Sequence, residues 1–296
     1  MAVSIVVRID CRFVQHGRPW DEQYMGHNKK LTLAIISTVL LISAYLNNGA
    51  ASFASQTRSE SSSFFETIYF VVNTTSPPFD NVLVRYALAM ATDRPAITNA
   101  LREEKFMYYP GIGLVPAYAG YETIRRLDVV IDGKTYDVLS YDPKAARELL
   151  AKGGFPEGVG KNKKKLVIEV LIYAGTDTQK LIGIVGQQWQ QNLGIDIVAL
   201  NRKWHDYLAE KSERNFKGVA VDGKALLLAD ASNLLSFASG EVEKKPCWDD
   251  QKFHQMLRDA SKVASSDATL GNSMFRECEA YLLRSMPVIP LYSRQP

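Results

Sequence analysis

The chain has 296 residues, of which 46% are hydrophobic and 23% are charged, close to the average of globular proteins. This length allows one or two domains with a sizeable core. The net charge of +3 is too small to indicate nucleic-acid binding, so we expect no nucleic-acid partner.

The first predicted element is an export signal. Two lysines precede the uncharged apolar run Leu31–Leu46, and polar and small residues follow it as far as Ala54. These are the parts of a secretory signal peptide, and the run is shorter than the about 20 residues that span a bilayer. We expect residues 1–54 to comprise an upstream extension and this signal, with Met25 as the natural start and an uncleaved anchor as the alternative.

Residues 55–76 are predicted to form a linker and a first strand, and two helix starts follow in Pro77–Arg94. Asp80 is predicted to cap the first helix, because its side chain can accept hydrogen bonds from free N–H groups of the first turn. Asp93 is predicted to cap the second, since Pro95 is tolerated in a first turn. An apolar face at helical spacing lies between the two caps and consists of Leu83, Tyr86, Ala87 and Met90.

The middle of the chain is predicted to be α/β. The basic run Lys161–Lys165 is interpreted as a solvated loop before the strand Leu166–Tyr173. A helix then ends at Gly194 and leads into a second strand, Ile195–Leu200. A strand, a helix and a strand with short joints predict a parallel pair with a right-handed crossover.

An antiparallel helix pair, Asp249–Ala264 and Thr269–Arg284, is predicted near the C-terminal end. This arrangement places Cys278 roughly 13 Å from the level of Cys247 at the helical rise per residue. A disulfide spans at most about 7 Å between Cα atoms, so we expect no bridge, and Cys278 is predicted to be a small core residue.

Five segments occur in an informative order: Pro77–Arg94, Tyr141–Leu150, Gln187–Ile197, Asp230–Leu234 and Pro287–Tyr292. Their residue order closely resembles signatures of the family 5 extracellular solute-binding proteins, which serve peptide-type ABC importers. The resemblance implies an α/β, periplasmic-binding-protein-like (type II) lobe over residues 77–296. It has a parallel or mixed sheet flanked by helices and ends in the helix pair.

The resemblance also implies the partners: an oligopeptide or related small ligand, and the membrane subunits of an ABC importer. Many family members carry a lipid-modified cysteine directly after the signal, but none stands near position 50 here. We therefore expect a free periplasmic protein, and we expect no cofactor.

In peptide-binding relatives the segment GWGADYPDPSNFL lines the ligand cleft, and its first aspartate pairs with the peptide ammonium. When the segments are aligned on Asp230, the glycine matches Gly223 and the tryptophan becomes Lys224. The ammonium-binding aspartate becomes Leu227, so a peptide ammonium would lose its charge partner. These four positions are the candidate ligand-binding residues, and Asp222 substitutes for the lost aspartate only if the alignment slips.

Two interpretations of this segment remain open. Lys224 serves an anionic or carboxylate-bearing ligand, or residues 226–228 have become part of the core and bind nothing. Among the residues nearby, the aromatic residues at helical spacing are predicted to pack in the core: Trp204, Tyr207 and Trp248. Arg202 and Lys211 are predicted to be surface charges.

No catalytic constellation is recognised in the sequence. His205 and His254 lack zinc-ligand spacing, and neither a serine-nucleophile motif nor a phosphate-binding glycine loop is present. We therefore predict a non-enzymatic protein without catalytic or metal-binding residues.

Members of the family that this chain resembles have two lobes that close on the ligand. Here the predicted signal is followed after a short stretch by motifs that belong to the middle of the family's sequence. We therefore expect mostly the second lobe, with self-association through the face that the first lobe would cover. The leading functional hypothesis is a truncated or degenerate binding component. The alternatives are an exported interaction or scaffold protein and an inactive remnant.

Overall fold

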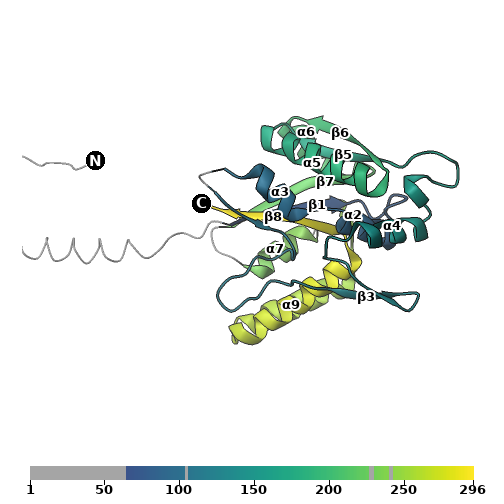
Figure 1. The fold of residues 1–296 in the computed structure, drawn as a ribbon. Coiled ribbons are helices and arrows are strands. Elements are labelled where there is room, and N and C mark those ends of the chain that lie inside the picture. The colour runs from purple at the N-terminus through teal and green to yellow at the C-terminus, as the bar shows by residue number, and fades with distance from the viewer. Residues whose placement is uncertain (1–64, 104–105, 227–229, 240–242) are drawn as a thin grey trace, which may run out of the picture. The chain divides into compact units, whose positions relative to one another are not determined.

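The computed structural model describes residues 65–103, 106–226, 230–239 and 243–296. The export signal, the Met25 start and Leu227 lie outside these described residues. In the described part, six strands form one mixed sheet in the order β2-β8-β1-β7-β5-β6 (Figure 1). Its strands are β1 (Phe65–Val72), β2 (Met107–Pro110), β5 (Val167–Tyr173), β6 (Asp196–Arg202), β7 (Val219–Leu226) and β8 (Val288–Gln295). A separate hairpin consists of β3 (Asp128–Ile131) and β4 (Lys134–Asp137).

The strand directions place the carboxyl ends of several strands along one side of the sheet. Strand β5 pairs in parallel with β6 and with β7, which confirms the predicted parallel pair. Strand β1 runs antiparallel to β7 and β8, so β8 shares the direction of β7. The carboxyl ends of β5, β6, β7 and β8 therefore meet the beginnings of β1 and β2 at one edge, which we call the carboxyl edge.

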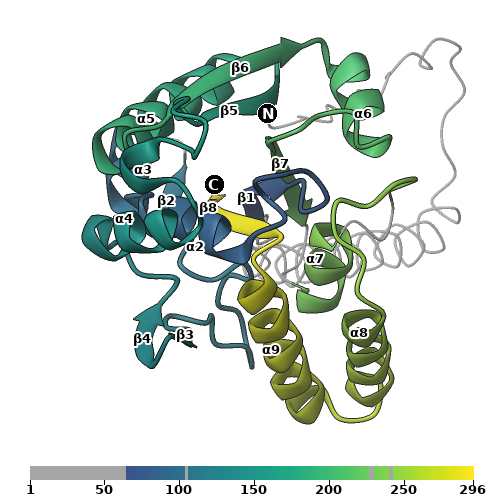
Figure 2. The ribbon, with the colours of Figure 1, turned by 90° about the vertical axis from the view of Figure 1, so that its right-hand side faces the viewer.

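Helices cover both faces of the sheet. Figure 2 shows α2 to α5 on one side of strands β1 and β8, and α6 and α7 on the other. The helices are α2 (Val82–Met90), α3 (Arg94–Leu101), α4 (Pro143–Lys152), α5 (Thr176–Leu193), α6 (Trp204–Ser212), α7 (Ala231–Ala238), α8 (Gln251–Ala264) and α9 (Ala268–Ser285), with a 3₁₀ turn η2 (Pro156–Gly158). The α8–α9 hairpin confirms the predicted C-terminal helix pair.

Local capping explains where most helices begin and end. Asp93 caps α3 by accepting from the Ala96 N–H, as predicted. The predicted cap of α2 at Asp80 is wrong by one residue, because the Asn81 side chain accepts from the Leu83 N–H. Gly194 ends α5 in the left-handed conformation at φ 70°, where glycine carries no Cβ penalty.

Two arginines in α2 and α3 bind main-chain carbonyls and join elements that are distant in sequence. Arg85 donates to the Ser285 carbonyl at the end of α9 and to the Phe79 carbonyl before α2. Arg94 donates to the Pro290 carbonyl of β8 over 2.8 Å. Both guanidinium groups are buried, and burial lowers the pKa of each to about 10. The main-chain partners satisfy most of these costly buried donors, although Arg94 Nη2 has no hydrogen-bond partner in the described part of the chain.

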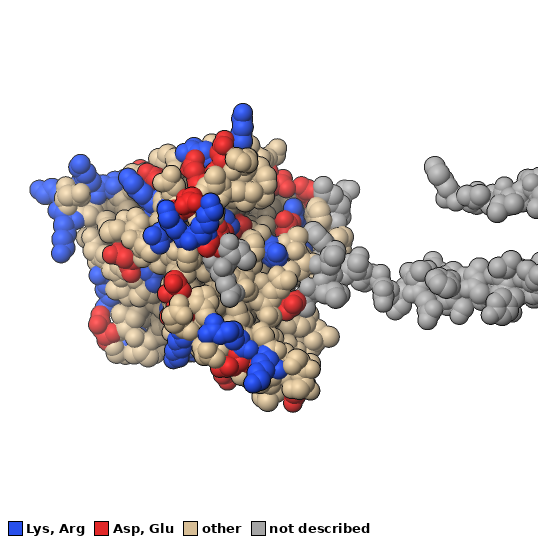
Figure 3. All heavy atoms as spheres, turned by 180° about the vertical axis from the view of Figure 1, so that it is seen from behind, with Lys and Arg blue, Asp and Glu red and all other residues tan. Residues whose placement is uncertain are grey.

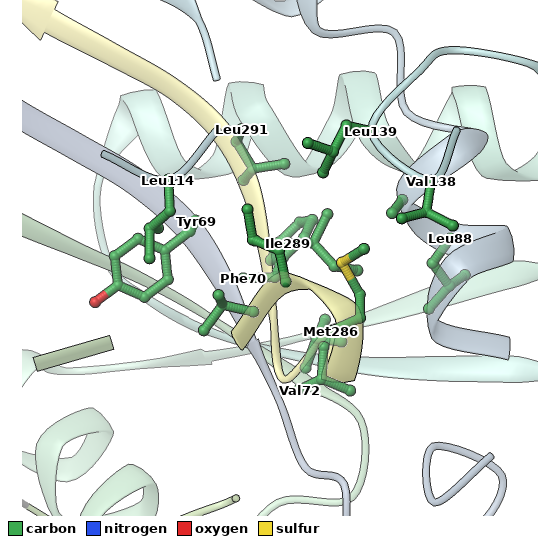
Figure 4. Close-up of a cluster of buried hydrophobic side chains, with 14 of the residues drawn as sticks. Tyr69, Phe70, Val72, Leu88, Leu114, Val138, Leu139, Met286, Ile289 and Leu291 are labelled. Carbon is green, nitrogen blue, oxygen red and sulfur yellow. The ribbon is translucent and has the colours of Figure 1, made fainter. Parts of the chain in front are cut away.

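Buried apolar side chains pack against both faces of the sheet, with residues of α5 on one face and of α7 on the other. Phe70 of β1 packs against Trp189 of α5, with ring centroids 5.6 Å apart, and the Trp189 indole donates to Thr92. Ile289 and Leu291 of β8 gather with Phe70 in the same cluster (Figure 4). Helix α2 is buried on nearly all sides, so the single apolar face predicted for it was too narrow.

The structure corrects two predicted environments and confirms others. Trp204 is 57% exposed rather than buried, and Lys211 is buried rather than a surface charge. Tyr207 is fully buried as predicted, and Trp248 packs partly buried against the core. The two described cysteines, Cys247 and Cys278, are free thiols, as predicted.

Charges are mixed over the surface. The Lys161–Lys165 run is exposed in a loop, as predicted. On the face drawn in Figure 3, basic and acidic side chains lie interspersed among uncharged ones. None of the described helices has the length and hydropathy needed to cross a bilayer.

Candidate functional site

The carboxyl edge is where open α/β sheets ordinarily bind ligands, because side chains and loops diverge there from the ends of parallel strands. A row of directly opposed residues crosses four strands just inside this edge and consists of Lys224, Thr67, Ser293 and Tyr109. Opposed residues in antiparallel pairs point to the same face of the sheet, so the four side chains lie side by side. This face is the one that carries α6 and α7.

The predicted site residues fall at the end of β7 and in the segment after it. Gly223 is opposite Ile68 of β1, and a Cβ added there would lie 2.4 Å from the Ile68 Cδ1 atom. Lys224 is half-buried, with its Nζ 4.6 Å from the centre of the Phe237 ring. Asp230 caps α7 by accepting from the N–H groups of two α7 residues, so its carboxylate has a structural role. The structure thus places Gly223 and Lys224 side by side on β7 and Asp230 at a helix start, and it groups no other predicted site residue with them among those described.

A buried ionic cluster lies beside Lys224 on the same face. Lys211 of α6 is 2.5 Å from a carboxylate oxygen of Asp222 and 2.8 Å from one of Glu243. Burial alone would lower the pKa of Lys211, but the two carboxylates raise it above the ordinary value, so the ammonium stays charged. Both Lys211 and Lys224 lie over the Phe237 ring, but only Lys211 has carboxylate partners in the described contacts.

Residue type alone does not predict this cluster, because lysine side chains are rarely buried. Two patterns in the sequence contained the signal. Lys211 follows the buried Tyr207 by one helical turn, so both lie on one face of α6. Asp222 alternates in β7 with the buried Ala220, so both point to the same face of the sheet.

Three aromatic side chains form a platform near the ends of β5 and β6. Trp204 stacks on Tyr207 at a centroid distance of 5.6 Å and an interplanar angle of 16°. Tyr173, the last residue of β5, meets the Trp204 ring edge-on at 5.2 Å. Trp204 is 57% exposed, and Leu208, which is one turn further along α6, is 41% exposed. The platform is therefore fixed from beneath and open to solvent above.

A cavity of about 370 Å³ lies over β2, β8 and β1 at the same edge. Three residues of the cross-strand row line it, namely Thr67, Ser293 and Tyr109. The remainder of its wall is largely apolar and includes Phe65, Ile112, Leu114, Pro116 and Ala117. Arg125 is its one charged lining residue among those described, and none of them is acidic.

A buried carboxylate holds the wall of this cavity in place. Glu279 of α9 is fully buried and accepts from the Leu114 and Val115 N–H groups at 2.7 and 2.9 Å. The Tyr121 hydroxyl donates to its other oxygen. Gly113 has no room for a side chain, because a Cβ there would lie 3.0 Å from the Glu279 carboxylate and closer still to other atoms. The loop over the cavity is therefore preorganised.

Within the described residues, histidine, cysteine and acidic side chains form no group of three that could hold a metal ion. The carboxyl edge instead offers an apolar cavity, an aromatic platform and two cations, Lys224 and Arg125, with no carboxylate partner among the described contacts. Such an arrangement suits the binding of a small ligand, in which apolar walls supply affinity and a few polar groups fix orientation.

Comparisons with known proteins agree on one family. The family model of bacterial extracellular solute-binding proteins, family 5 Middle, matches residues 33–243. The oligopeptide-binding protein OppA of Bacillus subtilis is 24% identical over 230 residues, which are 76% of this chain and 39% of that protein. The periplasmic oligopeptide-binding protein OppA of Salmonella typhimurium is 25% identical over 228 residues, with the same coverage of 76% and 39%.

A solved structure supports the fold. The Escherichia coli murein tripeptide-binding protein MppA matches with a TM-score of 0.61 and 23% identity, over 78% of this chain and 43% of that one. This likeness confirms the predicted α/β, periplasmic-binding-protein-like class. The chain spans about two fifths of the length of the curated relatives it matches.

Proposed function

Because this chain belongs to the bacterial extracellular solute-binding proteins of family 5, we propose that it captures a small peptide-like ligand for a peptide-type ABC importer. Capture without catalysis fits the site, in which the described residues supply apolar walls and cations. The relatives named periplasmic support a periplasmic location. The observation that carries the proposal is the carboxyl edge itself, where an apolar cavity and the half-buried Lys224 lie on one face of the sheet.

We propose Lys224 as the charged contact of the ligand. Its ammonium lies over the Phe237 ring and has no carboxylate partner among the described contacts, so an anionic group of the ligand would complete its environment. Gly223 precedes it on the strand, and Leu227 and Asp230 continue the proposed ligand-facing segment beyond β7. The sequence-based alternative, in which residues 226–228 are core and bind nothing, predicts no role for Lys224.

The test is thermal unfolding of the full chain with and without a mixed pool of di- to pentapeptides. Ligand at about 100 times its Kd stabilises a protein by about 2.7 kcal/mol, which raises the Tm by roughly 5 °C or more. We expect Lys224→Met to abolish most of the shift. Lys217→Met is the matched control, since Lys217 is exposed just before the opposite end of β7 and should leave the shift intact.

A second function, that of an exported interaction protein, is favoured by the neighbouring exposed side chains Trp204 and Leu208 on α6. Exposed apolar groups of this kind mark protein contacts as well as ligand sites. The same experiment separates the two functions. A cooperative unfolding transition whose Tm no peptide changes supports the interaction protein, for which a second copy of this chain is one partner to test. A Tm increase with peptide that is lost in Lys224→Met supports ligand capture.

A further inference from the structure

The charge of the cavity indicates which ligands it can hold. Its described lining contains one cation, Arg125, and no carboxylate. The next residue in the cross-strand row beyond Thr67 is Lys224, a second cation. A ligand ammonium placed in this cavity would be removed from water without an opposite charge, which is strongly unfavourable.

Arg125 is available to a ligand. It lies on the loop between Tyr121 and β3, its side chain is exposed, and none of its described contacts is an ion pair or hydrogen bond. The neighbouring Arg126 differs, because its Nε donates to Asp128 at 3.0 Å. Guanidinium groups bind carboxylates through paired hydrogen bonds, so Arg125 is suited to an anionic end group.

The remainder of the cavity is suited to an uncharged, apolar body. Phe65, Leu114 and Pro116 are among the residues of its apolar wall. The hydroxyls of Thr67 and Ser293 lie on its floor and can bind one polar atom of the ligand. Glu279 fixes the loop that carries Leu114, so the cavity exists before the ligand arrives.

We propose that this cavity binds apolar monocarboxylic acids, including peptides whose amino group is blocked or lies outside it, with Arg125 holding the carboxylate. The proposal rests on the proposed capture function but names the chemical class of the ligand. A volume of about 370 Å³ is at the lower end for small-molecule sites, so a compact acid with one ring or a short chain should fit.

The experiment is isothermal titration calorimetry of the full chain with three probes of closely similar size: 4-phenylbutyrate, 4-phenylbutanol and 4-phenylbutylamine. We expect the carboxylate to bind at least tenfold more tightly than the alcohol, and the amine to bind more weakly than either. Arg125→Gln should weaken phenylbutyrate binding at least tenfold and leave phenylbutanol unchanged. Arg126→Gln, the matched control, should change neither.

Several results would overturn the assignment: the amine binding as well as the carboxylate, no effect of Arg125→Gln, or no probe binding at all. Failure here and failure of the proposed function are separable. Peptides that shift the Tm through Lys224 while Arg125→Gln has no effect on phenylbutyrate would leave the capture function standing without this ligand class. Phenylbutyrate binding through Arg125, with no change of the Tm by peptides, would support this ligand class without the capture of peptides.

Discussion

At the scale of single residues, the environment of a charge decides its role. Lys211 and Lys224 both approach the Phe237 ring, but Lys211 is enclosed with Asp222 and Glu243. Residue type alone predicts lysine at the surface, and for Lys211 this prediction is wrong. The sequence pattern around Lys224 does not show which side chains approach it, because the Phe237 ring comes from the separate helix α7.

The buried pair predicts a large cost for removing its cation. Lys211→Met leaves the buried Asp222 carboxylate and the partly buried Glu243 carboxylate without this partner, and it should lower the free energy of unfolding by about 3–5 kcal/mol. The matched control is Lys244→Met, which removes an exposed pair with Glu213 and should cost about 1 kcal/mol or less. Urea denaturation measures both, and equal losses in the two variants would contradict the buried cluster.

At the scale of elements, apolar runs and capping residues predicted whether a segment is a helix or a strand more reliably than they predicted where it begins. The strand, helix and parallel strand from β5 to β6 follow from apolar runs and from Gly194, and all three are confirmed. The start of α2 was placed one residue early because both Asp80 and Asn81 are good caps. The choice between them depends on Arg85, which binds the main-chain carbonyls of Phe79 and Asp80 and so holds residue 80 in the preceding turn.

This assignment of the cap is testable. Asn81→Ala removes the acceptor for the Leu83 N–H and should cost about 1 kcal/mol of stability. Asp80→Ala should cost less than about 0.5 kcal/mol, because the carbonyl that Arg85 uses remains. Chemical denaturation measures the free energy of unfolding of both variants. A larger loss of stability in Asp80→Ala than in Asn81→Ala would show that Asp80 is the cap after all.

At the scale of the whole molecule, the sheet order could not be predicted. Strand β1 lies between β7 and β8, although β8 is more than two hundred residues away in the chain, and the Glu66–Arg294 ion pair at 2.5 Å joins them. Apolar runs identify strands but do not state which strands pair. The cavity over β2, β8 and β1 was missed for the same reason, since its wall comes from segments that only this order brings together.

The closed core predicts the reactivity of the two described thiols. Burial raises the pKa of Cys247 to about 12 and that of Cys278 to about 11. At pH 8 the thiolate fraction of either is on the order of 0.1% or less. In a Cys11→Ser background we expect neither thiol to react with Ellman's reagent within minutes, and both to react in 8 M urea. Rapid reaction of one thiol in the native protein would show that its part of the core opens locally.

The central position of β1 has a consequence for how the molecule is made. After β1 has been synthesised, both of its hydrogen-bonding edges stay unfilled until β7 and then β8 follow. Contacts across so long a stretch of chain form slowly, because loop closure comes before any gain from pairing. We therefore expect the nascent chain to expose this apolar strand until residues 288–295 are made, and to bind holding chaperones during that time.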